Sequence, residues 1–344
     1  GMANQTRQLA EFLRGEQLDV DIVQVNAAYK PLWVGKVPVL RALFRLIPYF
    51  ISLKNQCKSA DVVHVMANSG WSWHLFAAPA IFIARWLNKP VIVNYRGGYA
   101  REFFDKSWSI VEKSLNKAQA VLVPSVFLQE VFDDFGKTAQ EVPNVLDQNL
   151  FFPTAKLINT DKPHLIVTRN LEAIYDVATA INAFAIVKEQ YSQAKMSVAG
   201  TGPELSSLQR QVKELNLEKN IVFTGRLSPA EMAKLYQTAD IMLNTSTVDN
   251  TPNSIIEALA CGTPVVSTNV GGIPKLVTHQ HDALLIEAGD DNQMANWVIA
   301  LLKQEELSAQ LVKNGLTTIE KFYWPNVWQN LKACYDDAIE KIEK

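Results

Sequence analysis

The sequence predicts an α/β protein built from two Rossmann-like, doubly wound domains, and three observations support this fold class. The chain has 344 residues, which exceeds the length at which a single hydrophobic core usually stops growing. Short apolar segments of strand length alternate with segments of helical periodicity in both halves of the sequence. Glycine-rich turns follow several of the predicted strands, as they do in nucleotide-binding α/β domains.

The composition is that of an ordinary globular protein, with 48% hydrophobic residues, 20% charged residues and a net charge of −2. No basic excess indicates a nucleic-acid partner. The 3 cysteines are widely spaced, which indicates neither a disulfide framework nor a metal cluster and fits a reducing cytoplasm. No apolar run is long enough to span a bilayer, and no signal-peptide pattern opens the chain. We therefore expect a cytoplasmic protein without a bound metal or cofactor.

The first half of the chain begins with a predicted helix from Gln5 to Arg14, followed by a predicted strand from Val20 to Val25. Nucleotide-binding α/β domains normally begin instead with a strand and a glycine-rich turn. We therefore expect the first strand of the N-terminal domain to be missing from this chain. Further elements are predicted as strands at residues 61–66, 91–94 and 120–123, a helix at 71–87, and a helix opened by residues 124–125.

Residues 30–58 form a basic segment rich in apolar side chains. No acidic residue lies between Asp21 and Asp61, whereas six basic residues do: Lys30, Lys36, Arg41, Arg45, Lys54 and Lys58. A basic helix with a broad apolar face is typical of proteins that lie on an anionic membrane. The alternative is a helix packed on the sheet whose lysines are merely solvated. Residues 1–155 carry +3 and the remainder −5, so the first half is the one expected to face a membrane.

The second half repeats the alternation, with strands predicted at residues 164–168, 195–199, 221–224 and 239–245. The segment from residue 249 to residue 266 then predicts a loop, a short helix and a further strand. Thr251 or Asn253 can cap the first helical turn, and Pro252 suits an early helical position because its missing N–H has no intrahelical partner there. Gly262 ends the helix about two turns later.

The start of this helix predicts an anion site. The N–H groups of Asn253, Ser254 and Ile255 point outward from the positive end of the helix dipole. Glu257 lies four residues after Asn253 on the same helical face, roughly 6 Å further along the axis. A nucleoside diphosphate has a matching layout, with phosphate at the helix start and ribose hydroxyls at the carboxylate. The alternative is an ordinary amphipathic helix that happens to contain a glutamate.

The segment from Asp249 to Val266 resembles the signature of family 4 retaining glycosyltransferases, the "group 1" family with the GT-B fold of two facing Rossmann-like domains. That signature has two acidic residues separated by seven, the second opening an E-A-x-A-C-G-x-P-V-V run. Here the second acid is Glu257, and Asp249 takes the place of the usual first glutamate. The resemblance implies that Glu257 holds the donor ribose and that Asp249 contacts hydroxyls of the transferred sugar.

The same resemblance implies the domain boundaries. Residues 142–147 resemble the family's P-N-x-x-D hinge, so residues 1–155 are expected to form the acceptor-side domain and residues 156–324 the domain that binds the nucleotide sugar. The last helix, residues 325–344, is expected to cross back onto the first domain.

Further donor contacts follow from the resemblance. Arg169 matches the arginine that neutralises the donor diphosphate, whereas Tyr175 replaces the lysine that usually accompanies it. The turn that contains Gly200 and Gly202 flanks the donor pocket, and the nucleobase is placed near two residues of the next loop, Arg226 and Leu227.

On the acceptor side, the loop after residues 91–94 faces the reaction centre in the family. The resemblance makes Arg96 a candidate for contact with the acceptor or a phosphate, with Gly97 and Gly98 beside it. A plain tight turn is the alternative.

The catalytic set predicted from the sequence comprises Arg96, Arg169, Asp249 and Glu257. We expect metal-independent transfer of a sugar from a nucleoside-diphosphate sugar to an acceptor hydroxyl with retention of configuration, in bacterial surface polysaccharide or glycolipid synthesis. A nucleotide-sugar epimerase of the same fold and a non-catalytic nucleotide-sugar-binding protein are the alternatives. A dinucleotide oxidoreductase is disfavoured, because Leu205 falls at the third glycine position of its fingerprint. The nucleotide, the sugar and the acceptor stay open.

Overall fold

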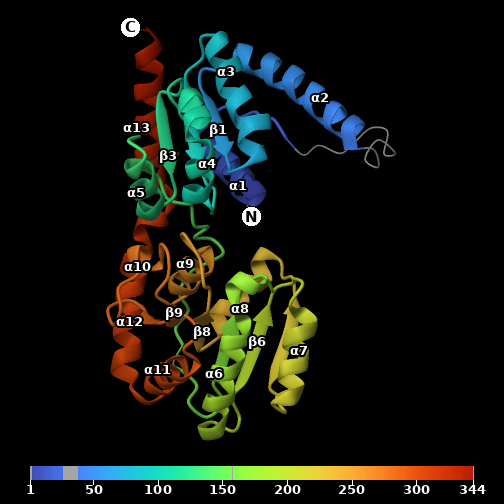
Figure 1. The fold of residues 1–344 in the computed structure, drawn as a ribbon. Coiled ribbons are helices and arrows are strands. Elements are labelled where there is room, and N and C mark those ends of the chain that lie inside the picture. The colour runs from blue at the N-terminus through green and yellow to red at the C-terminus, as the bar shows by residue number, and fades with distance from the viewer. Residues whose placement is uncertain (1, 26–37, 157, 344) are drawn as a thin grey trace. The chain divides into compact units, whose positions relative to one another are not determined.

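The computed structural model describes residues 2–25, 38–156 and 158–343 (Figure 1). The chain folds into two compact units. Unit 1 contains Gly1–Val145 and Trp324–Lys344, and unit 2 contains Leu146–Tyr323. The expected boundary at residue 155 lies inside unit 2, because Leu146 and Phe151 are buried in the core of that unit.

Unit 1 is built on a parallel sheet whose described strands follow one another in chain order. They are β1 (Val63–Ala67), β2 (Val91–Tyr95), β3 (Ala120–Val123) and the short β4 (Gln140–Glu141). Successive side chains of a strand point to opposite faces. Accordingly, Val91 and Val93 of β2 belong to one core cluster, whereas Ile92 belongs to another on the opposite face.

Helices cover both faces of this sheet. The first cluster contains side chains of α2 (Pro38–Ser59), the π-helical turn η2 (Trp73–Ala77), α3 (Ala78–Trp86), α4 (Ala100–Leu115) and α5 (Val126–Asp134). The second contains side chains of α1 (Met2–Gly15) and α13 (Trp324–Glu343). Ser125 caps α5 by accepting a hydrogen bond from the Leu128 amide at 3.3 Å, so the predicted helix start at residues 124–125 is confirmed.

The strand predicted at Val20–Val25 is wrong, since no strand is assigned before β1 in the described residues. Side chains, not a neighbouring strand, satisfy backbone groups of this segment. The carbonyl of Val20 accepts from Arg14 at 2.5 Å, and that of Val25 accepts from Arg45 at 2.7 Å. Its valines still pack on the two core clusters. The apolar pattern therefore indicates that these side chains are partly buried, but it does not show that the backbone pairs with a neighbouring strand.

Unit 2 is built on a parallel sheet of order β10-β9-β8-β5-β6-β7. The strands are β5 (His164–Val167), β6 (Lys195–Ala199), β7 (Ile221–Gly225), β8 (Ile241–Asn244), β9 (Val265–Thr268) and β10 (Leu284–Ile286). The order reverses at β5, whose neighbours are β6 on one side and β8 on the other. In doubly wound sheets, the carboxyl ends of the strands at such a switch point border a crevice that binds ligands.

Helices also cover both faces of the second sheet. One core cluster takes side chains from α6 (Val177–Gln190), α7 (Leu205–Glu214), α11 (Asp291–Lys303) and α12 (Glu305–Thr318). The other takes them from α8 (Pro229–Thr238), α9 (Asn253–Ala260) and α10 (Ile273–Leu276), together with the 3-10 turn η4 (Ile319–Phe322). Both units are therefore parallel α/β layers with helices on both faces, and the predicted fold class is confirmed.

The described helices include none that combines the length and the apolar character needed to cross a membrane.

Candidate functional site

The carboxyl ends of β5 and β8 bring together several of the predicted site residues in unit 2. Arg169 follows β5 after one residue, and the loop after β8 carries Asp249 into α9. Arg169 pairs through Nη2 with the Asp249 carboxylate, and its Nη1 donates to the Ser254 hydroxyl at 3.3 Å. We call Arg169, Tyr175, Asp249, Ser254 and Glu257 the switch-point cluster.

Tyr175 lies in the 3-10 turn η3 (Ala173–Tyr175), and its ring stacks on the Arg169 guanidinium. The guanidinium carbon is 4.1 Å from the ring centroid. A cation over an aromatic face is attracted by the ring quadrupole. The residue that replaces the family lysine therefore orients the remaining positive charge and adds none of its own.

The Asp249 carboxylate is largely buried, which raises its pKa, although the charge of Arg169 opposes the shift. The backbone carbonyl of Asp249 accepts a hydrogen bond from the Gly272 amide at 2.9 Å. Gly271 has a φ of +54°, and a Cβ there would lie 2.1 Å from the Asp249 carbonyl oxygen. The glycine pair after β9 therefore holds the backbone of Asp249 at a distance that no larger residue permits.

The start of α9 differs from the prediction. Pro252, not Thr251 or Asn253, occupies the N-cap position, and no side chain caps the helix. Because Pro252 is extended, with ψ 113°, its carbonyl accepts from the Ile255 amide at 3.0 Å. The expectation that the Ile255 amide points outward is therefore wrong. The Ser254 amide has no hydrogen-bond partner among the described residues. It therefore remains a candidate hydrogen-bond donor to an anion at the positive end of the helix.

Glu257 is half-buried on α9, and burial raises its pKa to about 7. The Tyr236 hydroxyl donates to this carboxylate and opposes the shift. Tyr236 is itself fully buried, and its oxygen lies 2.7 Å from the Thr168 hydroxyl. Donation from Thr168 to Tyr236 and from Tyr236 to Glu257 satisfies all three groups. The two hydroxyls thus connect the carboxylate to the residue that follows β5.

The turn after β6 packs against the loop that carries Arg169. A Cβ on Gly200 would lie 2.0 Å from the Arg169 carbonyl oxygen, and one on Gly202 would lie 2.2 Å from that of Leu171. These glycines therefore permit a close backbone approach. Arg226 is exposed and Leu227 half-buried in the loop after β7, and no described contact joins either residue to the switch-point cluster.

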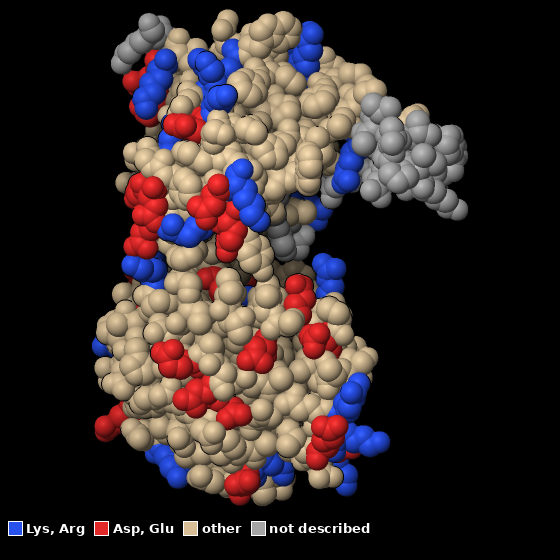
Figure 2. Space-filling model, in the orientation of Figure 1, with Lys and Arg blue, Asp and Glu red and all other residues tan. Residues whose placement is uncertain are grey.

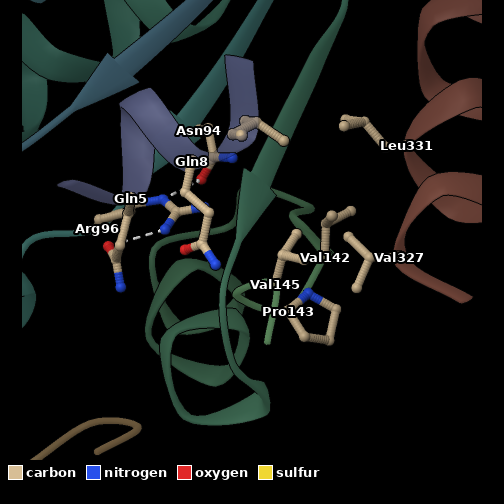
Figure 3. Close-up of a pocket in the computed structure, with 10 residues that line it drawn as sticks. Gln5, Gln8, Asn94, Arg96, Val142, Pro143, Val145, Val327 and Leu331 are labelled. Atoms are coloured by element: carbon tan, nitrogen blue, oxygen red, sulfur yellow. Dashed lines mark hydrogen bonds between the residues drawn. The ribbon is translucent and has the colours of Figure 1, made fainter. Parts of the chain in front are cut away.

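Arg96 lies in unit 1, directly after β2, where it borders a small cavity of about 10 Å³ (Figure 3). Its Nε donates to Asn94 at 3.0 Å, and its Nη1 donates to Gln5 at 2.9 Å and to Asn144. All three acceptors are neutral amide oxygens, and burial lowers the Arg96 pKa to about 10. The described residues thus leave this half-buried cation without a carboxylate partner, and its partial desolvation favours the approach of an anion.

Two further features of unit 1 bear on this loop. A Cβ on Gly97 would lie 2.1 Å from the Ser69 hydroxyl oxygen, so packing alone requires a glycine there. Gly98 has no atom within 4 Å of such a Cβ. The Nδ1 atom of His64 lies at hydrogen-bond distance, 2.8 Å, from the Tyr335 hydroxyl, and burial lowers the His64 pKa to about 3, so this imidazole is neutral.

Sequence reasoning missed Tyr236 and the role of Gly271. Tyr236 sits on α8 among ordinary apolar residues, and only its contact with Glu257 distinguishes it. The glycine pair at residues 271–272 is visible in the sequence, but its contact with Asp249 depends on the pairing of β8 with β9. Residues 2–25, 38–156 and 158–343 contain no group of three or more His, Cys, Asp or Glu side chains that could hold a metal ion.

Comparison with known families and sequences bears on the site. Residues 150–318, which contain the whole switch-point cluster, match the family described as "Glycosyl transferases group 1". The N-acetyl-alpha-D-glucosaminyl L-malate synthase of Bacillus anthracis is 29% identical over 59% of this chain. The alpha-monoglucosyldiacylglycerol synthase of Streptococcus pneumoniae is 28% identical over 75% of it. The aligned regions span 55% and 63% of these two relatives.

Solved structures show the same fold at low sequence identity. Anabaena HepE, solved with UDP and glucose, matches 86% of this chain and 82% of its own with a TM-score of 0.70 at 21% identity. The sucrose-phosphate synthase of Thermosynechococcus elongatus matches 99% of this chain and 94% of its own with a TM-score of 0.72 at 18% identity.

Proposed function

Because this chain belongs to the group 1 glycosyltransferase family and has the GT-B fold, we propose that it transfers a sugar from a nucleoside-diphosphate sugar to an acceptor hydroxyl, with retention of configuration. One observation carries this proposal. The switch-point cluster places a guanidinium, the start of a helix and an oriented carboxylate at the ligand-binding edge of the second sheet. The proposed domain roles are donor binding by unit 2 and acceptor binding by unit 1.

The chemistry requires stabilisation of the leaving diphosphate. The bond between the anomeric carbon and the diphosphate oxygen breaks, the acceptor oxygen takes its place, and the acceptor proton passes to the departing phosphate. Arg169 and the Ser254 amide supply fixed positive ends for the charge that develops. Glu257 accepts hydrogen bonds from the ribose hydroxyls, and Asp249 accepts them from the sugar. Arg226 and Leu227 line the nucleobase side.

We propose that Arg96 contacts the acceptor or a phosphate, since it is half-buried without a carboxylate partner in the described residues. We also propose a lipid-linked or membrane-proximal acceptor and a peripheral cytoplasmic location, with membrane contact through residues 30–58. The absence of acidic residues from that segment supports this, as does the diacylglycerol in the name of the pneumococcal relative. Residues 30–37 of the segment lie outside the described residues.

The first test is a thermal-shift screen of the full chain against UDP, GDP, ADP and their sugars. A ligand that binds only the folded state raises its apparent stability in proportion to the logarithm of its concentration over Kd. The nucleotide sugar that gives the largest shift is then incubated with candidate acceptors, and the anomeric configuration of the product is read by NMR. A lack of binding to every nucleotide would refute the proposal.

The alternatives give different products in the same assay. An epimerase converts the donor alone into its epimer, without an acceptor. A non-catalytic binding protein shows the thermal shift but returns the donor unchanged with every acceptor. We expect excess chelator to leave transfer unchanged, because Arg169 and the helix amide carry the stabilising charge in the proposed mechanism.

A further inference from the structure

Large apolar side chains are exposed on two neighbouring helical stretches of unit 1. On α2 they recur at the spacing of one helical face, and so they do on the stretch that leads through η2 into α3. Their exposed fractions run from 38% to 77%. We call these residues the exposed apolar face: Phe44, Ile47, Ile51, Trp71, Leu75, Phe82 and Trp86.

Contacts between the two stretches make this one surface. The Tyr49 hydroxyl of α2 donates to the Phe76 carbonyl of η2 at 3.0 Å. Lys54, one turn beyond Ile51 on α2, lies with its amine 5.1 Å from the Trp86 ring centroid on α3. Since Lys54 shares a helical face with Ile51, and Trp86 shares one with Phe82, this contact joins the outer faces of both helices.

The charged residues of α2 and α3 are all basic: Arg41, Arg45, Lys54, Lys58 and Arg85. Lys54 and Lys58 are exposed on the outer face of α2. The surface over α2 and α3, at the upper right of Figure 2, is accordingly tan and blue, without red.

We infer that α2 and α3 together form a surface that docks on an anionic lipid bilayer, with the exposed apolar face entering the headgroup region. Tryptophan rings and lysine amines both favour this interfacial zone, where the ring is apolar and the amine meets lipid phosphate. The inference rests on the membrane contact proposed above and extends it to a second helix. It does not depend on sugar transfer.

The charge pattern disfavours a second copy of the chain as the occupant. A two-fold interface brings the same patch of both copies together. Lys54 and Lys58 of one copy would then approach those of the other, and no acidic residue of α2 or α3 would offset them. An anionic bilayer supplies the missing negative charge.

The test is flotation of the full chain with vesicles of phosphatidylcholine alone or of phosphatidylcholine mixed with phosphatidylglycerol, without any donor. We expect binding to the anionic vesicles at low salt and its loss at high salt. The Lys54→Gln/Lys58→Gln double variant should bind about 25-fold more weakly, since each lysine near an anionic surface contributes about fivefold. Lys213→Gln, an exposed lysine of unit 2, is the control.

A matched pair tests the apolar contribution. Phe82 and Phe152 are equally exposed, at 47% each, but Phe152 lies in unit 2. We expect Phe82→Ser to weaken vesicle binding about tenfold, from loss of one buried aromatic ring, and Phe152→Ser to leave it unchanged. Because both side chains are exposed, thermal midpoints should stay close to that of the parent.

Three outcomes would overturn the inference. They are equal binding to neutral and anionic vesicles, equal loss in Phe82→Ser and Phe152→Ser, and a dimer in sedimentation that Phe82→Ser abolishes while no vesicle binds. Failure of the proposed sugar transfer is separate, because it is read from nucleotide-induced thermal shifts. Those shifts should be the same in all these variants.

Discussion

The ion pair between Arg169 and Asp249 is the central feature of the candidate site at the scale of single residues. Both side chains are 12% exposed, so each charge depends on the other for compensation. In the proposed mechanism, a diphosphate that approaches Arg169 shares this cation with Asp249. We expect the balance between the two anions to set the affinity for the product nucleotide.

Replacing Asp249 by Asn tests that balance. The variant frees the Arg169 guanidinium from its carboxylate, so we expect tighter binding of the free nucleoside diphosphate, by about tenfold, from loss of a competing charged hydrogen bond. Turnover should fall by at least as much, because the proposed sugar contact is lost. Calorimetry of the diphosphate and initial rates measure the two effects. Unchanged diphosphate affinity would contradict the competition.

Glu257 should make donor binding depend on pH. Its pKa is raised to about 7 by burial, so the carboxylate becomes protonated as the pH falls through 7 and accepts fewer hydrogen bonds. We expect the donor KM to rise below pH 7, by up to about tenfold per pH unit, and to stay constant above it. Glu257→Gln should show a raised KM at every pH, with no inflection near 7. An inflection that persists in this variant would assign it to another group.

Glu257→Gln, which should weaken donor binding, should stabilise the fold. A carboxyl whose folded-state pKa lies above its ordinary value of 4.5 destabilises the fold when ionised. The parent therefore loses stability between pH 4.5 and pH 7, by roughly 3 kcal/mol for a shift of this size. Glu257→Gln carries no such penalty, so its thermal midpoint should exceed that of the parent at pH 8, and the difference should shrink towards pH 5.

Tyr236→Phe tests whether the hydroxyl chain orients Glu257. The Tyr236 hydrogen bond lowers the Glu257 pKa, so its removal should move the acid limb of the donor-KM profile to higher pH. A ring that served packing alone would leave that limb in place, because Phe fills the same space. Tyr191→Phe, at the end of α6, is the matched control and should leave the profile unchanged.

At the scale of elements, the local pattern predicted α9 but not the hydrogen bonds at its start. The helix begins at Asn253 and ends at Ala260, because Pro252 lies before its first residue and Gly262 follows its end. Whether the Ile255 amide points outward depends on the extended conformation of Pro252, which the surrounding loop imposes. The position of that loop depends in turn on the glycine pair after β9.

Gly271→Ala should damage the site more than the fold. Its Cβ would lie 2.1 Å from the Asp249 carbonyl oxygen, whereas a Cβ on Gly289, which also has a positive φ, meets no atom within 4 Å. Both alanines carry the backbone strain of a left-handed conformation, about 1 kcal/mol. Only Gly271→Ala should also displace Asp249, so we expect at least a tenfold loss of turnover there and little loss in Gly289→Ala. Equal turnover in the two variants would separate the glycine pair from the site.

At the scale of the whole molecule, each unit has its own two-faced core, so each can respond to a ligand separately. With a saturating nucleoside diphosphate, we expect slower hydrogen exchange in residues 168–176 and 245–257 of unit 2. The amides of β1, β2 and β3 in unit 1 should exchange as before. Protection confined to unit 1 would reverse the proposed domain roles.

The sequence by itself determined the two parallel α/β units and the helix at 253–260, because periodicity, proline and glycine act over a few residues. The resemblance of its motifs to the family signature indicated Arg169, Asp249 and Glu257. Only the tertiary structure decided that Arg169 pairs with Asp249, 80 residues away, that Tyr236 meets Glu257, and that Val20–Val25 forms no strand. These outcomes depend on which segments meet at a sheet edge, and no local pattern encodes that.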